Sequence, residues 1–398
     1  MWLAERVRYS DVNWLPLLAA LALAVIGVFF VHSACLDAAA DEGWSREALR
    51  QLTWFVLGLG GCALAMHVPL RTWRRAALPL VGVALVVQLF MLVMADSSLV
   101  PRIKGQCNWI RIGTVNLQPS EFIKLAVLLA CARILTLPQA DAGRLVWVAM
   151  VALAGGIPLL LLAKEDRGGA LTFVPMLVGL LVLAGMHLRW IALAIVLGVP
   201  AMAGTLWYVL TRPDAQESYL VRRIFAFWNP EAYALQEGFQ TIRSLRSIGS
   251  GQWFGKGYGV GPQNNLNWLP EEHNDMIFAV IAEETGFIGS AIVVLLFLGL
   301  GLALLFASTT CRDRFGRLVI GGFACLIFGQ ACINLAVVTS LMPVTGVTLP
   351  FVSYGGSSLL ALFIGLGMCL GMSAARSHQF EATRAAMKLS RSIAPVGR

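Results

Sequence analysis

Four ionisable residues lie within an eight-residue stretch, 268–275, that runs directly into an apolar segment starting at Met276. They are Glu271, Glu272, His273 and Asp275. A carboxylate held at the boundary between water and hydrocarbon can accept a proton from a substrate hydroxyl. The stretch therefore predicts chemistry on a membrane-borne substrate, with Asp275 as the candidate base. The spacing also fits a second interpretation, in which Asp275 is the N-cap of the following helix, where capping and the helix dipole favour a carboxylate.

A second polar cluster opens the apolar segment that begins at Pro119. Pro119 fits a first helical turn, and Ser120 can cap the free backbone amides. Glu121 and Lys124 lie three residues apart, on one helical face, where they can neutralise one another. A capped helix start with an ion pair explains this pattern. An inward-facing polar wall in which Lys124 binds a phosphate explains the pattern equally well. The basic segment that precedes Pro119 and ends at Arg111 favours this second interpretation.

Three more polar features lie at the ends of apolar segments. Residues 164–169 carry four consecutive charges, which fit a solvated turn or a rim that holds Asp166 within reach of Lys124. Arg50 lies where an arginine can snorkel to the membrane interface. Residues 340–358 contain two prolines, three glycines and several hydroxyls, including Ser353 and Ser357. Such irregular backbone must be buried in protein or line a wet cavity, and its amides can bind anions.

The longest polar segment, 211–274, combines three patterns. Residues 222–230 are basic and aromatic, residues 238–248 have helical spacing, and residues 249–261 are rich in glycine and contain Lys256. A dinucleotide-binding glycine motif is excluded because no strand precedes these glycines. We expect the glycines to let the backbone turn close to a large ligand.

The composition identifies the kind of protein that must position these residues. The chain has 398 residues, of which 58% are hydrophobic and 13% are charged, and a mean hydropathy of +0.74. Apolar windows of the roughly 17–25 residues that cross a bilayer predict an all-α membrane protein with ten helices. Strands with the alternating pattern of a membrane barrel are not expected. The windows start near Trp14, Gln51, Ala76, Pro119, Val146, Gly169, Trp190, Met276, Leu318 and Ser358.

The distribution of Lys and Arg predicts the orientation. Basic residues gather in the N-terminal segment before the first apolar window, in every second connection between windows and in the tail 374–398. This distribution places both termini in the cytoplasm. The loop 211–274 then lies outside, between the seventh and eighth helices of a single membrane domain, 1–398. The net charge of +8 reflects this topology and attraction to anionic lipid rather than nucleic-acid binding.

Other sites and signals are excluded by pattern. The first apolar run is too long for a cleaved signal peptide, and nine more follow it. The eight cysteines form no CxxC pair, and we expect them to be free and mostly buried. The five histidines form no zinc motif, so no metal ligands are predicted.

An ordered series of motifs resembles the SEDS family (shape, elongation, division and sporulation), and its RodA branch more than its FtsW branch. The motifs occupy residues 118–121, 248–251, 255–257, 269–275, 282–286, 343–346 and 350–358. The resemblance covers nearly the whole chain. It implies ten membrane helices with both ends inside the cell, in the bacterial cytoplasmic membrane. It also implies a peptidoglycan glycosyltransferase that polymerises lipid II and works with a class B penicillin-binding protein.

The resemblance also assigns roles to residues. Asp275 matches the essential extracytoplasmic aspartate of the family. Glu121, Lys124 and Asp166 match polar residues that line its cavity, and Arg50 matches its arginine at the second span. The chain departs from the usual pattern at Glu165, Gln252, Asn274 and Met276. The departure at Glu165 weakens the match of Asp166. The departures at Asn274 and Met276 are conservative, so the match of Asp275 holds.

The implied reaction gives each group a task. Asp275 would take the proton from the 4-hydroxyl of an N-acetylglucosamine while undecaprenyl pyrophosphate leaves the other sugar, with inversion at the donor carbon. Cationic side chains, or a divalent cation such as Mg²⁺ or Mn²⁺, could take up the pyrophosphate charge. The predicted substrate-binding residues are Arg50, Arg111, Glu121, Lys124, Asp166, Lys256, Ser353 and Ser357. Three alternatives stay open: an FtsW-like septal polymerase, a lipid II flippase and a scaffold that recruits the penicillin-binding protein.

Overall fold

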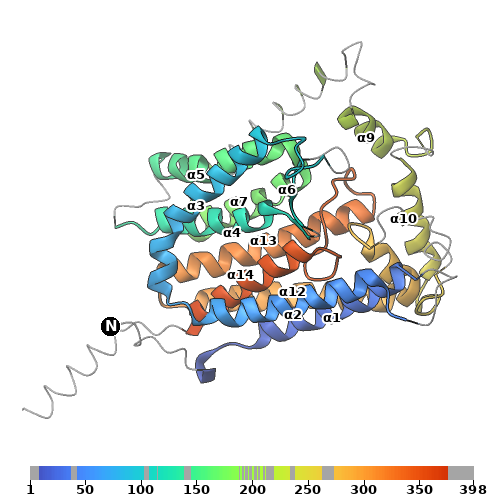
Figure 1. Cartoon of the computed structure of the whole chain (residues 1–398), viewed down its shortest axis with the longest axis horizontal. Helices are drawn as coiled ribbons and strands as arrows, with labels where there is room; N and C mark the ends of the chain where they lie inside the picture. Colours follow the sequence, from blue (N-terminus) through green and yellow to red (C-terminus); the bar gives the residue numbers. More distant parts are fainter. Residues whose placement is uncertain are drawn as a thin grey trace, which may run out of the picture.

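A computed structural model of the chain describes residues 9–36, 43–102, 107–113, 115–138, 145–187, 219–233, 238–261 and 273–374, with isolated residues between 189 and 211. The predicted tail 374–398 lies outside the described residues except for Ala374, as do parts of the predicted loop 211–274. Within the described residues the chain is mostly helical (Figure 1).

Among the described residues, seven helices are long and apolar enough to cross a membrane, which confirms a multi-pass membrane protein. They are α1 (Leu15–Ala34), α2 (Arg46–His67), α3 (Leu70–Val93), α5 (Leu145–Glu165), α12 (Ile277–Thr310), α13 (Arg314–Val338) and α14 (Gly356–Ala374). Shorter helices occupy the fourth and sixth predicted spans: α4 (Pro119–Ile134), and α6 (Arg167–Leu171) followed by α7 (Phe173–Leu183). The seventh predicted span, near Trp190, lies largely outside the described residues.

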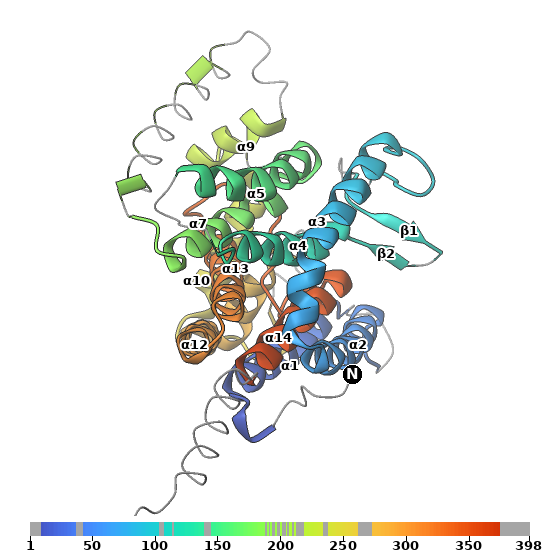
Figure 2. The ribbon, with the colours of Figure 1, turned by 90° about the vertical axis from the view of Figure 1, so that its left-hand side faces the viewer.

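Two short antiparallel strands depart from the predicted all-α fold. Strand β1 (Ile110–Ile112) pairs with β2 (Val115–Leu117), with Arg111 opposite Asn116. The hairpin projects from the side of α3 and α4 (Figure 2). Each strand has only three residues, too few for an alternating pattern to be recognised in the sequence.

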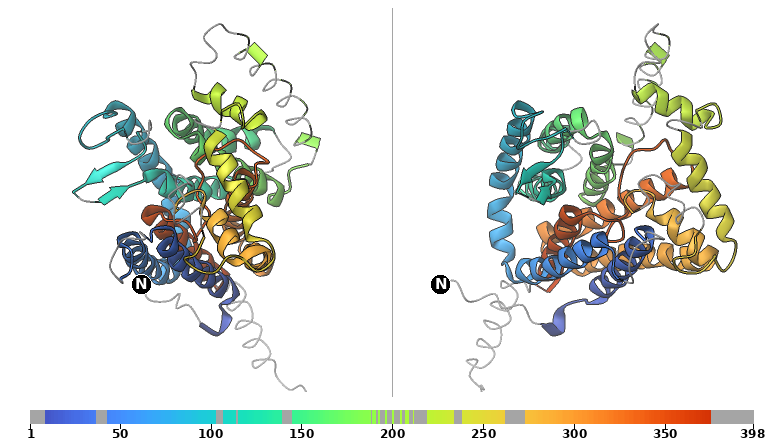
Figure 3. Two further views of the ribbon diagram at one scale, coloured as in Figure 1. Left: turned by 90° about the vertical axis from the view of Figure 1, so that its right-hand side faces the viewer. Right: turned by 45° about the vertical axis from the view of Figure 1, so that its right-hand side comes forward.

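Two helices of the large loop lie beside the bundle. The predicted helix over 238–248 is confirmed as α10 (Gly238–Gly251), and the basic aromatic segment forms α9 (Tyr219–Trp228). Helix α10, yellow in Figure 3, runs across the ends of the bundle helices rather than along them. It packs on the first turns of α12, and Ser244 Oγ donates to Val338 O at the end of α13.

Close packing of α2 and α14 holds the centre of the bundle. Gly367 and Gly371 lie four residues apart on α14, and a Cβ on either would clash with the α2 backbone at Cys62 or Met66. Small residues at this spacing let membrane helices approach closely, where dispersion and weak polar contacts replace the hydrophobic effect.

Helix α12 is divided by a kink at Gly286. This residue has φ 67° and ψ −161°, a backbone conformation that glycine adopts without a steric penalty. A continuous helix would bond Phe287 N–H to Glu283 O and Ile288 N–H to Glu284 O. Instead, these N–H groups donate to Gln252 O (2.7 Å) and Trp253 O (3.2 Å). The carbonyls of Glu283 and Glu284 accept from the N–H groups of Lys256 (2.9 Å) and Gly257 (3.0 Å).

This interlock gives two glycines of the segment 249–261 a structural role, and the expected approach of this segment to a large ligand stays a prediction. The glycines bring the loop close to helix α12, because a Cβ on Gly251 would clash with Ala282 O and one on Gly255 with Glu284 O. The loop backbone therefore docks on the kink, and three of the sequence motifs, 248–251, 255–257 and 282–286, form one structural unit.

Candidate active site

Several helix ends converge on one end of the bundle. The N–H of Gln118, just before α4, donates to Ser357 Oγ in the first turn of α14 (3.0 Å). The N–H of Tyr354 donates to His273 O, just before α12 (2.9 Å). The starts of α4, α12 and α14 therefore meet, and the residue that follows α5, Asp166, joins them through Gln118 Nε2 (3.4 Å).

The start of α4 contains the predicted ion pair. Lys124 Nζ lies 2.9 Å from Glu121 Oε1, and both side chains are buried. Pro119 occupies the first helical turn, as predicted. The predicted capping by Ser120 is wrong: Ser120 Oγ is buried with no hydrogen-bond partner among the described residues. The cap residue Gln118 makes no side-chain capping bond either.

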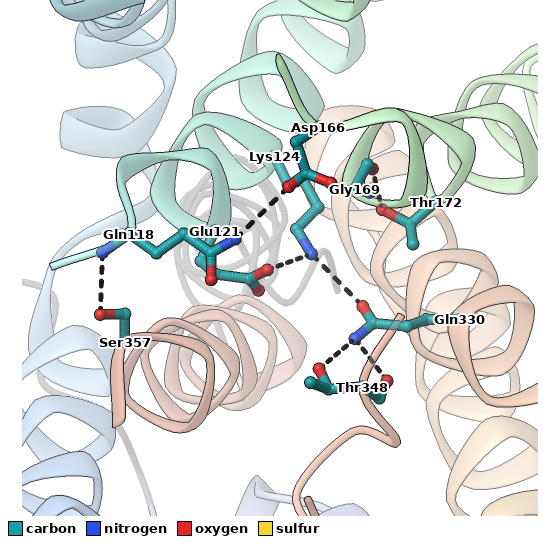
Figure 4. A network of polar contacts seen from close by, with 9 residues as sticks. All are labelled: Gln118, Glu121, Lys124, Asp166, Gly169, Thr172, Gln330, Thr348 and Ser357. Carbon is teal, nitrogen blue, oxygen red and sulfur yellow. Dashed lines mark hydrogen bonds and ion pairs between the residues drawn. The ribbon is translucent and has the colours of Figure 1, made fainter. Parts of the chain in front are cut away.

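Lys124 also contacts a side chain that the sequence analysis missed. Its Nζ donates to Gln330 Oε1 on α13 (3.3 Å), and Gln330 Nε2 in turn donates to Thr348 O (3.0 Å) (Figure 4). A buried ammonium group is costly unless it is paired and hydrogen-bonded. Glu121 and Gln330 together meet this requirement, and they hold the ammonium between α4 and α13.

Asp166 lies at the rim of the same cluster (Figure 4). Its Oδ1 accepts the N–H of Gly169 (2.7 Å) and so caps α6. Burial raises the pKa of Asp166 above its ordinary value, the Gly169 hydrogen bond opposes this, and nearby Glu121 raises the pKa further. The predicted closeness of Asp166 to the face of Lys124 is confirmed, since Figure 4 shows the two side chains next to each other and the ion pair of Glu121 and Lys124 acts on the pKa of Asp166.

Asp275 is buried, with 6% of its surface exposed, and it precedes the helix cap. The N-cap of α12 is Met276, and this cap has no side-chain hydrogen bond. The N-cap interpretation of Asp275 is therefore wrong. The backbone carbonyl of Asp275 accepts from Asn334 Nδ2 on α13 (2.7 Å), and the same amide donates to Val347 O (2.7 Å).

Helix α13 links the two charged sites. Gln330 and Asn334 are four residues apart, so they lie on one face and about 6 Å apart along the axis. One amide contacts Lys124 and the other holds the backbone of Asp275, while both donate to consecutive carbonyls of the segment 347–348. Lys124 and the backbone of Asp275 are thus both held by the same face of α13.

Sequence reasoning had a signal for both amides that was not used. Buried polar side chains at i and i+4 in a membrane span are costly and usually have a specific partner. Gln330 and Asn334 carry this signal within the apolar α13.

The segment between α13 and α14 is irregular and largely buried, as predicted. Gln51 of α2 holds it, because its Nε2 donates to Ser353 O (3.1 Å) and its Oε1 accepts from Gly355 N–H (3.3 Å). Ser353 Oγ accepts from Leu349 N–H (2.8 Å). Buried Phe351 has φ 62°, a strained conformation for a bulky residue, and strain of this kind is common at functional sites.

Three predicted substrate-binding residues lie outside this cluster. Arg50 is exposed at the start of α2, Arg111 is exposed on β1, and Lys256 is exposed in the loop that docks on the α12 kink. Their predicted roles stay predictions. Ser353 and Ser357 lie inside the cluster, where both hydroxyls accept backbone N–H groups and keep their own protons to donate.

A metal site does not fit the described side chains. Within the described ranges, no group of three or more His, Cys, Asp or Glu residues is arranged to hold a metal ion. The cation that this site offers to an anionic ligand is Lys124.

Comparison with known proteins identifies the family. The sequence model of a family described as "Cell cycle protein", which joins FtsW, RodA and SpoVE, matches residues 13–378. The chain belongs to the FtsW/RodA/SpoVE family. This is the SEDS family that the sequence motifs resemble.

Curated relatives cover almost the whole chain. A probable peptidoglycan glycosyltransferase FtsW of Trichlorobacter lovleyi is 35% identical over 379 residues, which are 94% of this chain and 96% of the relative. Stage V sporulation protein E of Bacillus subtilis is 34% identical over 375 residues, which are 92% of this chain and 98% of the relative.

Solved structures of the family have the same fold. A chain of a peptidoglycan synthase complex that coordinates polymerization and crosslinking superposes with a TM-score of 0.74 at 28% identity, covering 94% of this chain and 98% of that chain. The rod shape determining protein RodA of Thermus thermophilus superposes with a TM-score of 0.63 at 27% identity, covering 94% of this chain and 97% of that chain. Both branches of the SEDS family are therefore similar to this chain.

Proposed function

We propose that this SEDS protein is a peptidoglycan glycosyltransferase that joins lipid II molecules into glycan strands. The observation that carries the proposal is the common register of Asp275 and Lys124 on one face of α13. When a carboxylate and a cation are held by the same helix, the carboxylate can take the proton of the acceptor hydroxyl while the cation stabilises the leaving pyrophosphate. The name of the relative from Trichlorobacter lovleyi, probable peptidoglycan glycosyltransferase FtsW, supports this chemistry.

Asp275 acts as the general base. It takes the proton from the 4-hydroxyl of the N-acetylglucosamine at the acceptor. The resulting oxygen attacks the anomeric carbon of the donor sugar, and the bond from that carbon to the pyrophosphate oxygen breaks. The pyrophosphate leaves with the electron pair on its undecaprenyl carrier, and attack from the opposite side inverts the donor carbon.

Lys124 stabilises the charge that develops on the leaving pyrophosphate. Its ammonium is held by Glu121 and Gln330 in a buried site, where an electrostatic interaction is stronger than in water. Binding of the pyrophosphate would require Lys124 to share its charge between Glu121 and the ligand. Asp166 lies beside this ion pair, and burial raises the pKa of its carboxyl.

We further propose ten membrane helices in the bacterial cytoplasmic membrane, with both termini in the cytoplasm and the loop 211–274 outside. The first described turn (Tyr9–Asp11), which precedes α1, packs against α14, which supports a common side for the two ends of the chain. The site then faces the extracytoplasmic side. A class B penicillin-binding protein is the proposed partner, and the similarity to a chain of a peptidoglycan synthase complex supports it.

Cell-wall elongation is the role expected from the RodA resemblance, and a septal role is the second candidate. The septal role is favoured by the FtsW names of relatives at 34–35% identity, whereas the RodA structure is at 27%. Localisation of a fluorescent fusion separates the two roles. Recruitment to the division site assigns the septal role, and a patchy distribution along the cell length assigns elongation.

Polymerisation of lipid II by the purified chain, with and without its cognate penicillin-binding protein, tests the proposed activity. Glycan strands formed in detergent, where no transbilayer gradient exists, distinguish an enzyme from a flippase. Asp275→Asn should abolish polymerisation while leaving the complex with the partner intact, which distinguishes an enzyme from a scaffold. If the wild-type chain forms no polymer under any of these conditions, the proposal fails.

A further inference from the structure

The loop that docks on the α12 kink has a fixed backbone. Four hydrogen bonds join residues 252–257 to α12 on both sides of Gly286, and Gly255 N–H also donates to Gly251 O (2.8 Å). At the other end of the loop, Tyr258 Oη donates to Phe29 O on α1 (2.7 Å). The loop therefore cannot turn its side chains inward without breaking several buried backbone hydrogen bonds.

This fixed loop presents large apolar side chains outward. Trp253, Phe254, Tyr258 and Val260 have 64%, 82%, 46% and 60% of their surface exposed. We call these four residues the loop patch. A rigid loop in water would expose four such side chains only at a cost, so their grouping on one short loop indicates a contact surface.

The loop patch continues a lipid-facing surface on α12. The Trp253 ring packs edge to face on Phe287, with ring centroids 5.2 Å apart. From Phe287 the exposed apolar side chains run on along α12, a helix with the length and hydropathy of a membrane span. They are Phe287, Ile288, Ile292, Val294, Leu295, Leu298, Leu302, Leu305 and Phe306.

The loop patch meets a second exposed face at α1. Phe29, whose carbonyl accepts the Tyr258 hydroxyl, is itself exposed and packs on Trp44 at 5.7 Å. The loop thus spans the gap between two apolar helix faces at the same end of the bundle. Trp and Tyr side chains gather at this depth in membrane proteins because their apolar rings lie in lipid while their polar atoms reach water.

We propose that the loop 252–260 lies in the headgroup layer of the outer leaflet and anchors the α12 kink there. The side chains of the loop patch contact the lipid bilayer. The exposed Lys256, in the middle of the loop, can direct its ammonium toward lipid phosphates. The proposal does not depend on the catalytic assignment, because no residue of the loop patch belongs to the active-site cluster.

Tryptophan quenching by brominated lipids tests this placement. The full-length protein and its Trp253→Phe variant are reconstituted in nanodiscs of phosphatidylcholine and phosphatidylglycerol. Three lipid preparations are compared: acyl chains without bromine, acyl chains brominated near the headgroup, and acyl chains brominated near their methyl end. The chain has 12 tryptophans, so the difference between the two proteins isolates the signal of Trp253. A swapped variant, Trp253→Phe with Phe254→Trp, moves the indole by one residue and serves as the matched comparison.

We expect the Trp253 signal to be quenched strongly by bromine near the headgroup, less by bromine near the chain end, and weakly by iodide in the buffer. The swapped variant should regain the same pattern, because Phe254 is the most exposed member of the loop patch. Quenching of both indoles by iodide, with none by either brominated lipid, would overturn the proposal. So would shielding from iodide that appears only when a penicillin-binding protein is added, since that result assigns the loop patch to a protein partner.

Discussion

Replacement of Asn334 by leucine should uncouple the candidate base from the rest of the site. Asn334 is fully buried, and its single Nδ2 group donates to both Asp275 O and Val347 O at 2.7 Å. Leucine has a similar volume but no donor. The substitution therefore leaves two buried carbonyl groups without this partner, and it removes the tie between the start of α12 and the segment after α13.

The size of the effect follows from these two hydrogen bonds. A buried polar group that loses its partner costs roughly 1–3 kcal/mol, so two such groups cost about 2–6 kcal/mol in the free energy of unfolding. The effect on turnover should be larger than the effect on binding. A displacement of a catalytic group by about 1 Å can reduce the rate about 100-fold, and we expect a loss of kcat of this order with a small change in KM.

A matched control is available in the same bundle. Gln88 of α3 is also buried, and its Nε2 donates to one backbone carbonyl, Pro158 O of α5, at 3.0 Å. It makes no described contact with the active-site cluster. Gln88→Leu should lower thermal stability by a comparable amount per hydrogen bond while the folded enzyme keeps its kcat.

The assay is polymerisation of lipid II by purified variants at equal folded concentration, together with thermal unfolding in the same detergent. Asn334→Asp provides a second test, because a carboxylate cannot donate and would face two carbonyl oxygens. Wild-type kcat in both Asn334 variants would refute the positioning role. An equal loss of kcat in Gln88→Leu would also refute it, because that result means that any loosening of the bundle impairs the reaction.

Four other substitutions test the charged residues of the site. Asp275→Asn keeps the size of the side chain but removes its basicity, so we expect polymerisation to fall to background without a loss of thermal stability, and residual turnover near the wild-type value would rule out the base. Lys124→Met leaves buried Glu121 without its cation and should destabilise the fold by about 3–5 kcal/mol. Adding Glu121→Gln should restore stability but not activity, and an active double variant would exclude Lys124 as the phosphate-binding cation. Asp166→Asn keeps the oxygen that caps α6 and removes a carboxyl whose pKa is raised by burial. The folded state binds the proton of Asp166 more tightly than the unfolded state does. The protonated carboxyl therefore contributes stability to the fold below the ordinary pKa of 3.8, and this contribution is lost as pH rises through the folded pKa. The Asn variant should therefore unfold at a higher temperature than the wild type at neutral pH, and calorimetry that finds a lower one would contradict the assignment.

Local patterns in the sequence predicted the parts of the site that lie close together in the chain. Pro119 and the spacing of Glu121 and Lys124 specify a helix start with an ion pair, and the structure has both. Composition likewise specified a multi-pass helical protein. Both inferences depend on neighbours within one turn of a helix or on the average over a window, which a single sequence contains.

Long-range contacts could not be predicted in the same way. Asn334 reaches Asp275 across 59 residues, and Lys124 reaches Gln330 across 206. The kink in α12 was also hidden. Gly286 directly follows two glutamates and a threonine, but the window that starts at Met276 is apolar on average and so satisfies the pattern of a continuous span. The kink forms only because the loop 252–257 supplies replacement hydrogen bonds, and hydropathy contains no information about such a partner.

The divided helix α12 changes which part of the molecule carries the candidate base. Ahead of the kink, residues 277–285 pack against α10 and exchange backbone hydrogen bonds with the loop that follows it, while residues 287–310 form the long apolar span. Asp275 therefore precedes the part of α12 that α10 and the loop hold, and the kink separates it from the long apolar span. A displacement of α10 would therefore act on the segment next to the candidate base before it acted on the long span beyond Gly286.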